Sequence, residues 1–382
     1  MNIIAFFNNK GGVGKTSLVY HLAWMFSDLG LRVLAADLDP QANLSSMFLQ
    51  ESELEGFWPD GEHPRTVLGA VRPIIRGLGD LGAVRAEQVD RHLALVVGDL
   101  GLSVFEDKLS ASWPLCSNRD ESAFRVVSSF YRLICRAAED SRSDLVLVDV
   151  GPNLGAINRA VLIATTHVVI PLAPDLFSMQ GLRNLGPTLR QWREEWSERL
   201  PKNPAADLQL PPAEFQPAGY IFMQHFAREK RPVKAYDKWM QRMPAEYRSA
   251  VLNEPAEGPL RVEEDSYCLG TLKHYRSLMP MAMDARKPMF RLKPADGAIG
   301  AHTYAVQECA KDFERLARRI AKACGVALRD PQSRHQPADR RRVGGGGDPH
   351  WRGRRGGSCR RRVCGGAQQR DQEHPGHLLG AH

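Results

Sequence analysis

The chain has 382 residues, of which 43% are hydrophobic and 25% are charged, and its formal net charge at pH 7 is +7. This length permits one open sheet of about 320 residues as well as two or three smaller domains. No apolar run approaches the roughly 18 residues that a membrane-spanning helix needs, and the chain starts in a strand-like segment without a basic leader. We therefore expect a cytoplasmic protein that makes no membrane contact.

The cysteines are scattered along the chain. There are seven of them, and none forms a Cys-x-x-Cys pair. Single thiols suit a reducing compartment, and they argue against a zinc site or an iron–sulfur centre.

The first predicted elements are a strand over Ile3–Phe7 and a helix over Leu18–Leu29, joined by a glycine-rich loop. Backbone N–H groups and the positive end of a helix converge in such a loop, where a chain of phosphates can bind. The glycines let the backbone wrap closely around the anion. The predicted phosphate-binding residues are Lys10, Gly11, Gly12, Val13, Gly14, Lys15, Thr16 and Ser17.

The side chains of this loop have expected roles. In the usual phosphate loop Lys15 reaches the β- and γ-phosphates and Thr16 places its hydroxyl on Mg²⁺, while Ser17 can bond the α-phosphate. The usual spacing has glycine at position 9, but this chain has Asn9 and an additional lysine, Lys10. Lys10 is either a solvated loop lysine or a residue that reaches a phosphate held by a second subunit, as an arginine finger does in trans.

A second apolar strand starts at Arg32 and ends in two carboxylates, Asp37 and Asp39. The two-residue period of a strand places both on the same side. At the carboxyl end of a parallel strand beside the phosphate loop, such a pair can bind hydrated Mg²⁺ and orient a water molecule. Taken alone, the pattern also fits a strand-ending turn rich in Asp and Pro.

A third strand, Leu145–Asp149, is apolar until it ends in an acid. The loop Gly151–Gly155 follows it and is suited to sensing a γ-phosphate. Asp149 is the expected Mg²⁺ partner. The sequence therefore predicts Thr16, Asp37 and Asp149 as metal-binding residues.

With these three motifs in this order, the chain resembles the ParA/MinD family of P-loop ATPases, whose variant phosphate loop carries an additional signature lysine that Lys10 matches. The resemblance continues through Arg159–Leu172, Ser178–Leu182 and Lys273–Pro280, and it spans about residues 1–325. It implies ATP rather than GTP, an ATP-dependent homodimer and slow hydrolysis stimulated by a ParB-like partner. In the ParA branch it also implies DNA binding without sequence preference. The loop Val150–Asn153 departs from the family pattern, in which two prolines and a small polar residue follow the acid.

Basic residues are unevenly distributed. The segment 329–382 holds 12 arginines and 5 acidic residues, which accounts for the whole excess of positive charge. This Arg/Gly-rich tail has too few apolar residues to form a core, so we expect it to be disordered. It either raises non-specific DNA affinity by counterion release or is an artefact such as translation in a shifted frame.

Two strings in the remaining chain are candidates for DNA contact. The first contains Arg231 and Lys234, and the second contains Lys273, Arg276 and Lys287. By resemblance, Arg276 lies where ParA proteins place a basic residue for DNA. The alternative for both strings is a solvated, salt-bridged charged face.

Two segments, near 50–92 and 199–267, look longer than in compact family members. They are either surface insertions that carry partner specificity or ordinary loop elaboration. A final helix over Thr303–Cys324 repeats apolar residues at helical spacing and predicts a packing helix rather than a membrane anchor. We therefore expect a ParA-like ATPase domain over 1–328 and the tail over 329–382.

The predicted fold is α/β, a doubly wound and mainly parallel sheet with helices on both faces. The predicted chemistry is weak intrinsic ATP hydrolysis, with Lys10, Lys15, Asp39 and Asp149 as catalytic residues. The cellular role would be plasmid partition, chromosome segregation or cargo positioning by a nucleoid-associated protein. Two alternatives remain open, a metabolic ligase of the dethiobiotin-synthetase type and an ATP-gated scaffold that positions a protein cargo with negligible turnover.

Overall fold

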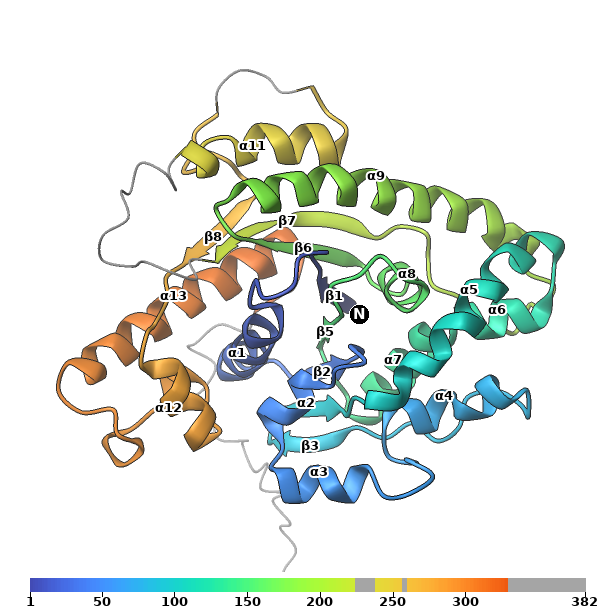
Figure 1. Ribbon diagram of the computed structural model, residues 1–382, viewed down its shortest axis with the longest axis horizontal. Coiled ribbons are helices and arrows are strands. Elements are labelled where there is room, and N and C mark those ends of the chain that lie inside the picture. Colours follow the sequence, from blue (N-terminus) through green and yellow to red (C-terminus); the bar gives the residue numbers. More distant parts are fainter. Residues whose placement is uncertain (224–237, 256–259, 329–382) are drawn as a thin grey trace, which may run out of the picture. The chain divides into compact units, whose positions relative to one another are not determined.

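The computed structural model describes residues 1–223, 238–255 and 260–328, all within a compact unit that spans Met1–Ser333. In this part of the chain, eight strands form one sheet in the order β3-β4-β2-β5-β1-β6-β7-β8 (Figure 1). Neighbouring strands are parallel except for the antiparallel pair β3 and β4. The strands are β1 Asn2–Phe6, β2 Val33–Asp37, β3 Glu87–Asp90, β4 Leu93–Val96, β5 Leu145–Asp149, β6 His167–Leu172, β7 Gln216–Met223 and β8 Cys268–Leu272.

The central strands are buried on both faces. Every residue of β2 and β5 is buried, which explains why both read as continuous apolar runs before their terminal aspartates. Successive residues point to opposite faces, so Val146 and Val148 join one hydrophobic cluster while Leu145 and Leu147 join the other.

One face of the sheet is covered by helices from the middle of the chain, whose apolar side chains form the first cluster. These helices lie together on one side of the sheet in Figure 1. They are α4 Val67–Arg76, α5 Glu106–Leu115, α6 Glu121–Val127, α7 Ser129–Asp140, α8 Ala156–Ile163, α9 Leu176–Arg199 and α11 Met243–Glu246. Short 3₁₀ turns η1 Leu100–Phe105, η2 Cys116–Asn118 and η3 Leu200–Lys202 and the π-helical turn η4 Tyr247–Leu252 connect or extend them.

The opposite face is covered by helices from the two ends of the described chain, which supply the second cluster. They are α1 Lys15–Asp28, α2 Asn43–Phe48, α3 Glu51–Phe57, α12 Leu278–Ala285 and α13 Ala301–Ala323, with the 3₁₀ turns η5 Met289–Arg291 and η6 Pro294–Asp296. The predicted doubly wound sheet with helices on both faces is therefore confirmed. The predicted final packing helix corresponds to α13, whose buried residues include Val306, Phe313 and Ile320.

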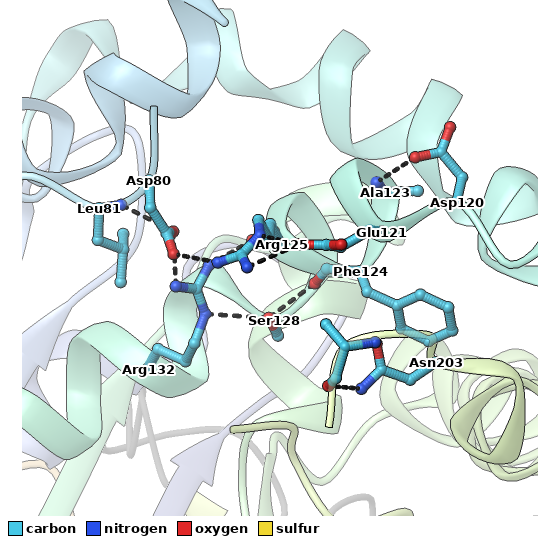
Figure 2. Close-up of polar contacts among 11 residues, drawn as sticks. Asp80, Leu81, Asp120, Glu121, Ala123, Phe124, Arg125, Ser128, Arg132 and Asn203 are labelled. Carbon is cyan, nitrogen blue, oxygen red and sulfur yellow. Dashed lines mark hydrogen bonds and ion pairs between the residues drawn. The ribbon is translucent and has the colours of Figure 1, made fainter. Parts of the chain in front are cut away.

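The segment near 50–92 is anchored to the rest of the unit by charge. Asp80 lies between two arginines (Figure 2), with Oδ1 2.6 Å from Arg132 Nη1 and Oδ2 2.8 Å from Arg125 Nη1. The Arg132 side chain is only 4% exposed. Loss of Asp80 would leave the buried charge of Arg132 uncompensated, so this cluster fixes the segment onto α6 and α7.

The second segment, 199–267, contains the sheet strand β7, so only part of this range lies outside the sheet. Arg231, Lys234 and the tail 329–382 lie outside the described residues. Within the described residues, no helix combines the length and the apolar character that crossing a membrane requires.

Candidate nucleotide site

The phosphate loop lies where three strands end together. Asp149 on β5 is in register with Asp37 on β2 and with Phe6 on β1, so both carboxylates lie beside the loop that follows β1. Gly12 and Gly14 have φ angles of 73° and 87°, in the left-handed region, and Gly14 caps the N-terminus of α1. A side chain at either position would be strained, which accounts for glycine there. The loop and the helix end thus present backbone N–H groups to one point, as anion binding requires.

Lys15 is folded over this loop. Its Nζ atom donates hydrogen bonds to the carbonyl oxygens of Asn8 at 3.2 Å and of Lys10 at 3.4 Å, and the residue is 7% exposed. Burial lowers the pKa of Lys15, while the Asp149 and Asp39 carboxylates act against this fall. Within the described chain, the hydrogen bonds of this buried ammonium go to carbonyl oxygens, so it is available for an incoming phosphate.

Lys10 contacts its own subunit. Its Nζ atom lies 2.5 Å from Asp175 Oδ2 and 5.6 Å from the centre of the Phe177 ring. Asp175 also caps α9, because its Oδ1 atom accepts a hydrogen bond from the Ser178 N–H group at 2.7 Å. This ion pair therefore joins the phosphate loop to the start of α9.

Asp37 and Asp149 are fully buried, and both have oxygens that accept no hydrogen bond in the part of the chain that the structure describes. These oxygens are Oδ1 of Asp37 and both oxygens of Asp149. Burial raises the pKa of Asp37 to about 7, and it raises the pKa of Asp149 well above its ordinary value. The Asp37 carboxylate adds to the rise at Asp149, while the nearby Thr16 hydroxyl and Lys15 oppose it. Unpaired buried carboxylates at the end of a sheet indicate a site for a cation.

The donor set fits Mg²⁺ bound together with phosphates. No group of three or more His, Cys, Asp or Glu residues suited to hold a metal occurs among the described residues, so the protein alone does not form a closed metal cage. Mg²⁺ usually keeps several water ligands and takes one or two carboxylates plus substrate phosphates. The pair of aspartates beside the Thr16 hydroxyl offers that partial set.

Asp39 lies next to the loop that follows β5. Its Oδ1 atom accepts a hydrogen bond from the Gln41 N–H group at 3.0 Å, and it lies 3.2 Å from where a Cβ on Gly151 would be. The backbone at Gly151 thus approaches this carboxylate closely. Asn158 is buried and holds this loop, because its Nδ2 atom donates hydrogen bonds to the carbonyl oxygens of Gly151 at 2.9 Å and Asn153 at 2.7 Å.

An apolar cavity of about 130 Å³ opens beside Ser17. Met223 at the end of β7, Lys273, His274, Tyr275 and Met279 are among its lining residues. A mostly apolar cavity next to an anion-binding loop has the character of a site for a heterocyclic ring.

Known proteins with similar sequences support a nucleotide site at this position. The model of the AAA_31 family, described as an AAA domain, matches residues 1–202, which is more than half of the chain. The chain is 32% identical over 184 residues to a putative replication protein A of Rhizobium rhizogenes, covering 48% of this chain and 42% of that one. It is 29% identical over 197 residues to the chromosome-partitioning ATPase Soj of Thermus thermophilus, covering 52% and 65%. The chain belongs to the ParA/MinD family of P-loop ATPases.

A solved structure extends the similarity beyond the matched half. The crystal structure of protein DIP2308 from Corynebacterium diphtheriae is similar with a TM-score of 0.60 and 26% sequence identity, covering 85% of this chain and 99% of that one. The similarity in fold to a solved structure therefore extends over most of this chain. The chain spans less than two thirds of the length of each of the two curated relatives.

Two of the basic residues that were predicted to contact DNA, Lys273 and Lys287, have acidic partners in this ParA/MinD-family chain. Lys273 Nζ lies 2.5 Å from Glu308 Oε2, and Lys287 Nζ lies 2.7 Å from Asp296 Oδ1. Arg276 lies in the loop between β8 and α12 with a φ angle of 49°. The predicted string thus carries much less net positive charge than its sequence suggests.

Sequence reasoning missed several polar residues that shape the ParA/MinD-type site. Asn8 is 1% exposed, donates to the Pro171 carbonyl oxygen at 2.6 Å and accepts from the Lys10 N–H group at 3.0 Å. Glu106 accepts hydrogen bonds from the N–H groups of Ala156 and Ile157 at the start of α8. Asn8 directly precedes the loop and could have been suspected, whereas nothing near Glu106 in the sequence points to α8.

Proposed function

We propose that this protein is an ATP-dependent partition or positioning ATPase that dimerises with ATP, binds DNA without sequence preference in that state and is released by partner-stimulated hydrolysis. The observation that carries the proposal is the convergence of Lys15 with two buried, incompletely paired carboxylates, Asp37 and Asp149, at one end of the sheet. The similarity to Soj, a chromosome-partitioning ATPase, supports the general role.

Nucleotide and metal would bind at the phosphate loop. The backbone from Gly11 to Gly14 would surround the phosphates of ATP, and Lys15 would exchange its carbonyl partners for the β- and γ-phosphate oxygens. Thr16, Asp37 and Asp149 would hold Mg²⁺, directly or through water. When bound, Mg²⁺ neutralises charge on the phosphates and stabilises the transferring phosphoryl group.

Hydrolysis would depend on Asp39. This carboxylate is 7% exposed and lies against the Gly151 backbone, where a γ-phosphate could be sensed. It would accept a hydrogen bond from the attacking water and orient that water for displacement. Lys15 would stabilise the charge that develops on the phosphoryl oxygens, and Lys10 would do the same for the nucleotide of the second subunit.

Dimerisation would cover exposed apolar side chains around the site. Leu154 in the loop after β5 is 38% exposed, and Leu176 and Phe177 at the start of α9 are 49% and 74% exposed. Leu176 and Phe177 directly follow Asp175, whose ion pair with Lys10 must open if Lys10 is to reach a phosphate in trans. The trans role therefore predicts that Lys10→Ala slows ATP turnover, and normal turnover in that variant would remove Lys10 from the catalytic set.

DNA binding would use phosphate contacts from Lys273, Arg276 and Lys287, with Arg231 and Lys234 as further candidates. Because Lys273 and Lys287 are paired with acids, we expect weak, strongly salt-dependent binding that requires the two adjacent surfaces of a dimer. A ParB-like partner would stimulate hydrolysis, and the ATP-bound protein would then be nucleoid-associated in the cytoplasm.

The test is binding of the full chain to non-specific duplex DNA with ATP, ADP or no nucleotide, across a salt series. Binding that needs ATP, weakens steeply with salt and is lost in Arg276→Glu supports the proposal. Nucleotide-independent or absent binding, despite ATP uptake, contradicts the DNA-based role and favours a protein-cargo scaffold. Transfer of the γ-phosphoryl group to a small carboxylate instead of water would favour the ligase alternative.

A further inference from the structure

Asp37 uses its two carboxylate oxygens differently. Its Oδ2 atom accepts hydrogen bonds from both the backbone N–H group of Ser45 at 2.7 Å and the Ser45 hydroxyl at 2.8 Å. The Oδ1 atom accepts none from the described residues, although the side chain is fully buried. One oxygen is therefore fixed by the protein and the other is left for a ligand.

The Ser45 hydroxyl is constrained in turn. Ser45 is fully buried on α2, and its Oγ atom accepts a hydrogen bond from the Gly98 N–H group at 2.8 Å while it donates to Asp37. A hydroxyl has one proton to donate, so the accepted bond from Gly98 leaves that proton directed at Asp37. Threonine could keep both bonds, whereas alanine would lose them and keep only the backbone donor.

Gly98 also restricts the carboxylate sterically. A Cβ atom at this position would lie 2.7 Å from Cγ of Asp37 and 2.8 Å from its Oδ2 atom. The backbone after β4 is thus in direct contact with the carboxylate, and only glycine fits. Ser45 and Gly98 together hold Asp37 in one side-chain orientation.

Side chains of the segment near 50–92 form hydrogen bonds with the turn that contains Gly98. The Trp58 indole N–H group donates to the Gly98 carbonyl oxygen at 3.2 Å, and the Thr66 hydroxyl donates to the next residue, Asp99, at 2.6 Å. His63 Nδ1 lies 2.7 Å from the same Asp99 oxygen, and Asp99 is fully buried. These bonds fix the Gly98 N–H group in place for Ser45.

We propose that Ser45 is a positioning residue for metal binding, which holds Asp37 through Oδ2 so that Oδ1 stays available to Mg²⁺. The proposal rests on the proposed nucleotide function, because it assigns Asp37 to the Mg²⁺ bound with ATP. Residues that orient a metal ligand through hydrogen bonds typically change metal affinity by 10–100-fold when they are removed.

The experiment measures binding of a fluorescent ATP analogue to the full chain, first in EDTA and then over a Mg²⁺ titration. The variants are Ser45→Ala, the conservative Ser45→Thr and the matched control Ser46→Ala. Ser46 lies on the same helix, but it is exposed and its hydroxyl donates to the Asn43 carbonyl oxygen. We expect Ser45→Ala to raise the Mg²⁺ midpoint about 10-fold or more, with affinity in EDTA unchanged. Ser45→Thr should restore the midpoint to within about twofold, and Ser46→Ala should leave it unchanged.

The outcomes separate this inference from the proposed function. If the wild-type chain binds no nucleotide, the proposed function fails. If it binds with Mg²⁺ dependence and Ser45→Ala keeps the wild-type midpoint, the positioning role is wrong. An equal loss of affinity in EDTA and in Mg²⁺, without rescue by threonine, would show that Ser45 supports the fold rather than the metal. Thermal unfolding of the nucleotide-free variants identifies a variant that fails to fold. If Ser45→Ala fails to fold, Ser45→Thr tests the proposal by itself. A folded threonine variant with a Mg²⁺ midpoint raised 10-fold would then contradict it.

Discussion

Charged side chains are placed differently in two regions of the molecule. One region is the end of the sheet at β2 and β5, and the other is the surface near α12 and α13. At the sheet end, Asp37 and Asp149 are buried and leave oxygens without partners in the described chain. On the α12–α13 side, the side chains of Lys273 and Lys287 are 46% and 41% exposed and each is paired with an acid. The buried carboxylates therefore destabilise the nucleotide-free protein, and a bound cation would relieve this cost. The exposed, paired lysines impose very little cost.

This difference shows which of the two regions gives evidence of a bound ligand. Burying a carboxylate without a partner is costly, so its persistence in a folded protein calls for an explanation such as a bound cation. A solvent-exposed ion pair contributes about 0–1 kcal/mol and is compatible with no function at all. The nucleotide site is therefore supported more strongly than the DNA surface.

The largest effect is expected at Asp39. Asp39→Ala should lower ATP hydrolysis roughly 100- to 1000-fold, because positioned acid–base groups contribute on this order. ATP binding should persist, so the variant should accumulate as an ATP-bound dimer. Phosphate release and light scattering measure the two effects, with the exposed aspartate variant Asp60→Ala as control. Negligible turnover in the wild type that is unchanged in Asp39→Ala would instead favour the ATP-gated scaffold.

The next effect is expected at Lys15. Lys15→Gln removes the buried ammonium at the phosphate loop and should weaken ATP binding about 100-fold, since losing a buried charge-assisted contact costs about 2–5 kcal/mol. Lys322→Gln, at an exposed position on α13, is the matched control. Isothermal titration provides the affinities. Wild-type affinity in the Lys15 variant would place the phosphates elsewhere.

The buried carboxylates also predict a dependence of stability on pH. The pKa of Asp37 is about 7 in the folded protein, above its ordinary value, so the folded state binds this proton more tightly than the unfolded state. Without nucleotide, the contribution of Asp37 to stability should fall by a few kcal/mol as pH rises from about 4 to about 7 and should then level off. Asp37→Asn should remove part of this fall, as denaturant midpoints at pH 5 and pH 8 will show. An identical fall in both proteins would mean that Asp37 is not strained by burial.

The smallest effects are expected on the α12–α13 surface. Lys273→Ala should change the free energy of unfolding by less than about 1 kcal/mol, because the ion pair with Glu308 is exposed. If Lys273 contacts DNA, Glu308→Gln should strengthen DNA binding modestly and Lys273→Ala should weaken it. The pair formed by Lys287 and Asp296 offers the same test at a second place. No change in DNA affinity in either direction would assign this surface to folding alone.

Local sequence predicts the sheet-end side of this comparison well. The order of strand, glycine-rich loop and helix, and the two apolar strands ending in Asp37 and Asp149, follow from residues close together in the chain. Parallel register then places both acids beside the loop. The sequence therefore predicts both the fold and the family resemblance.

The sequence does not predict the contacts between segments that are far apart in the chain. The bond from Gly98 to Ser45 joins residues 53 positions apart, and the pair of Lys10 with Asp175 joins residues 165 positions apart. Neither has a local signal, because each depends on how separate loops meet at the sheet end. The basic string around Lys273 likewise gives no local sign of its ion pair, since the acidic partner Glu308 lies on another element, α13.

The most direct test of the nucleotide site is isothermal titration of ATP into the full chain, in Mg²⁺ and in EDTA, with wild type and Asp149→Asn. We expect ATP to bind more tightly in Mg²⁺ than in EDTA, and we expect Asp149→Asn to abolish this difference while the protein stays folded. Equal affinity in Mg²⁺ and EDTA for the wild type, or a full Mg²⁺ effect in Asp149→Asn, would contradict a metal–nucleotide site at the ends of β2 and β5.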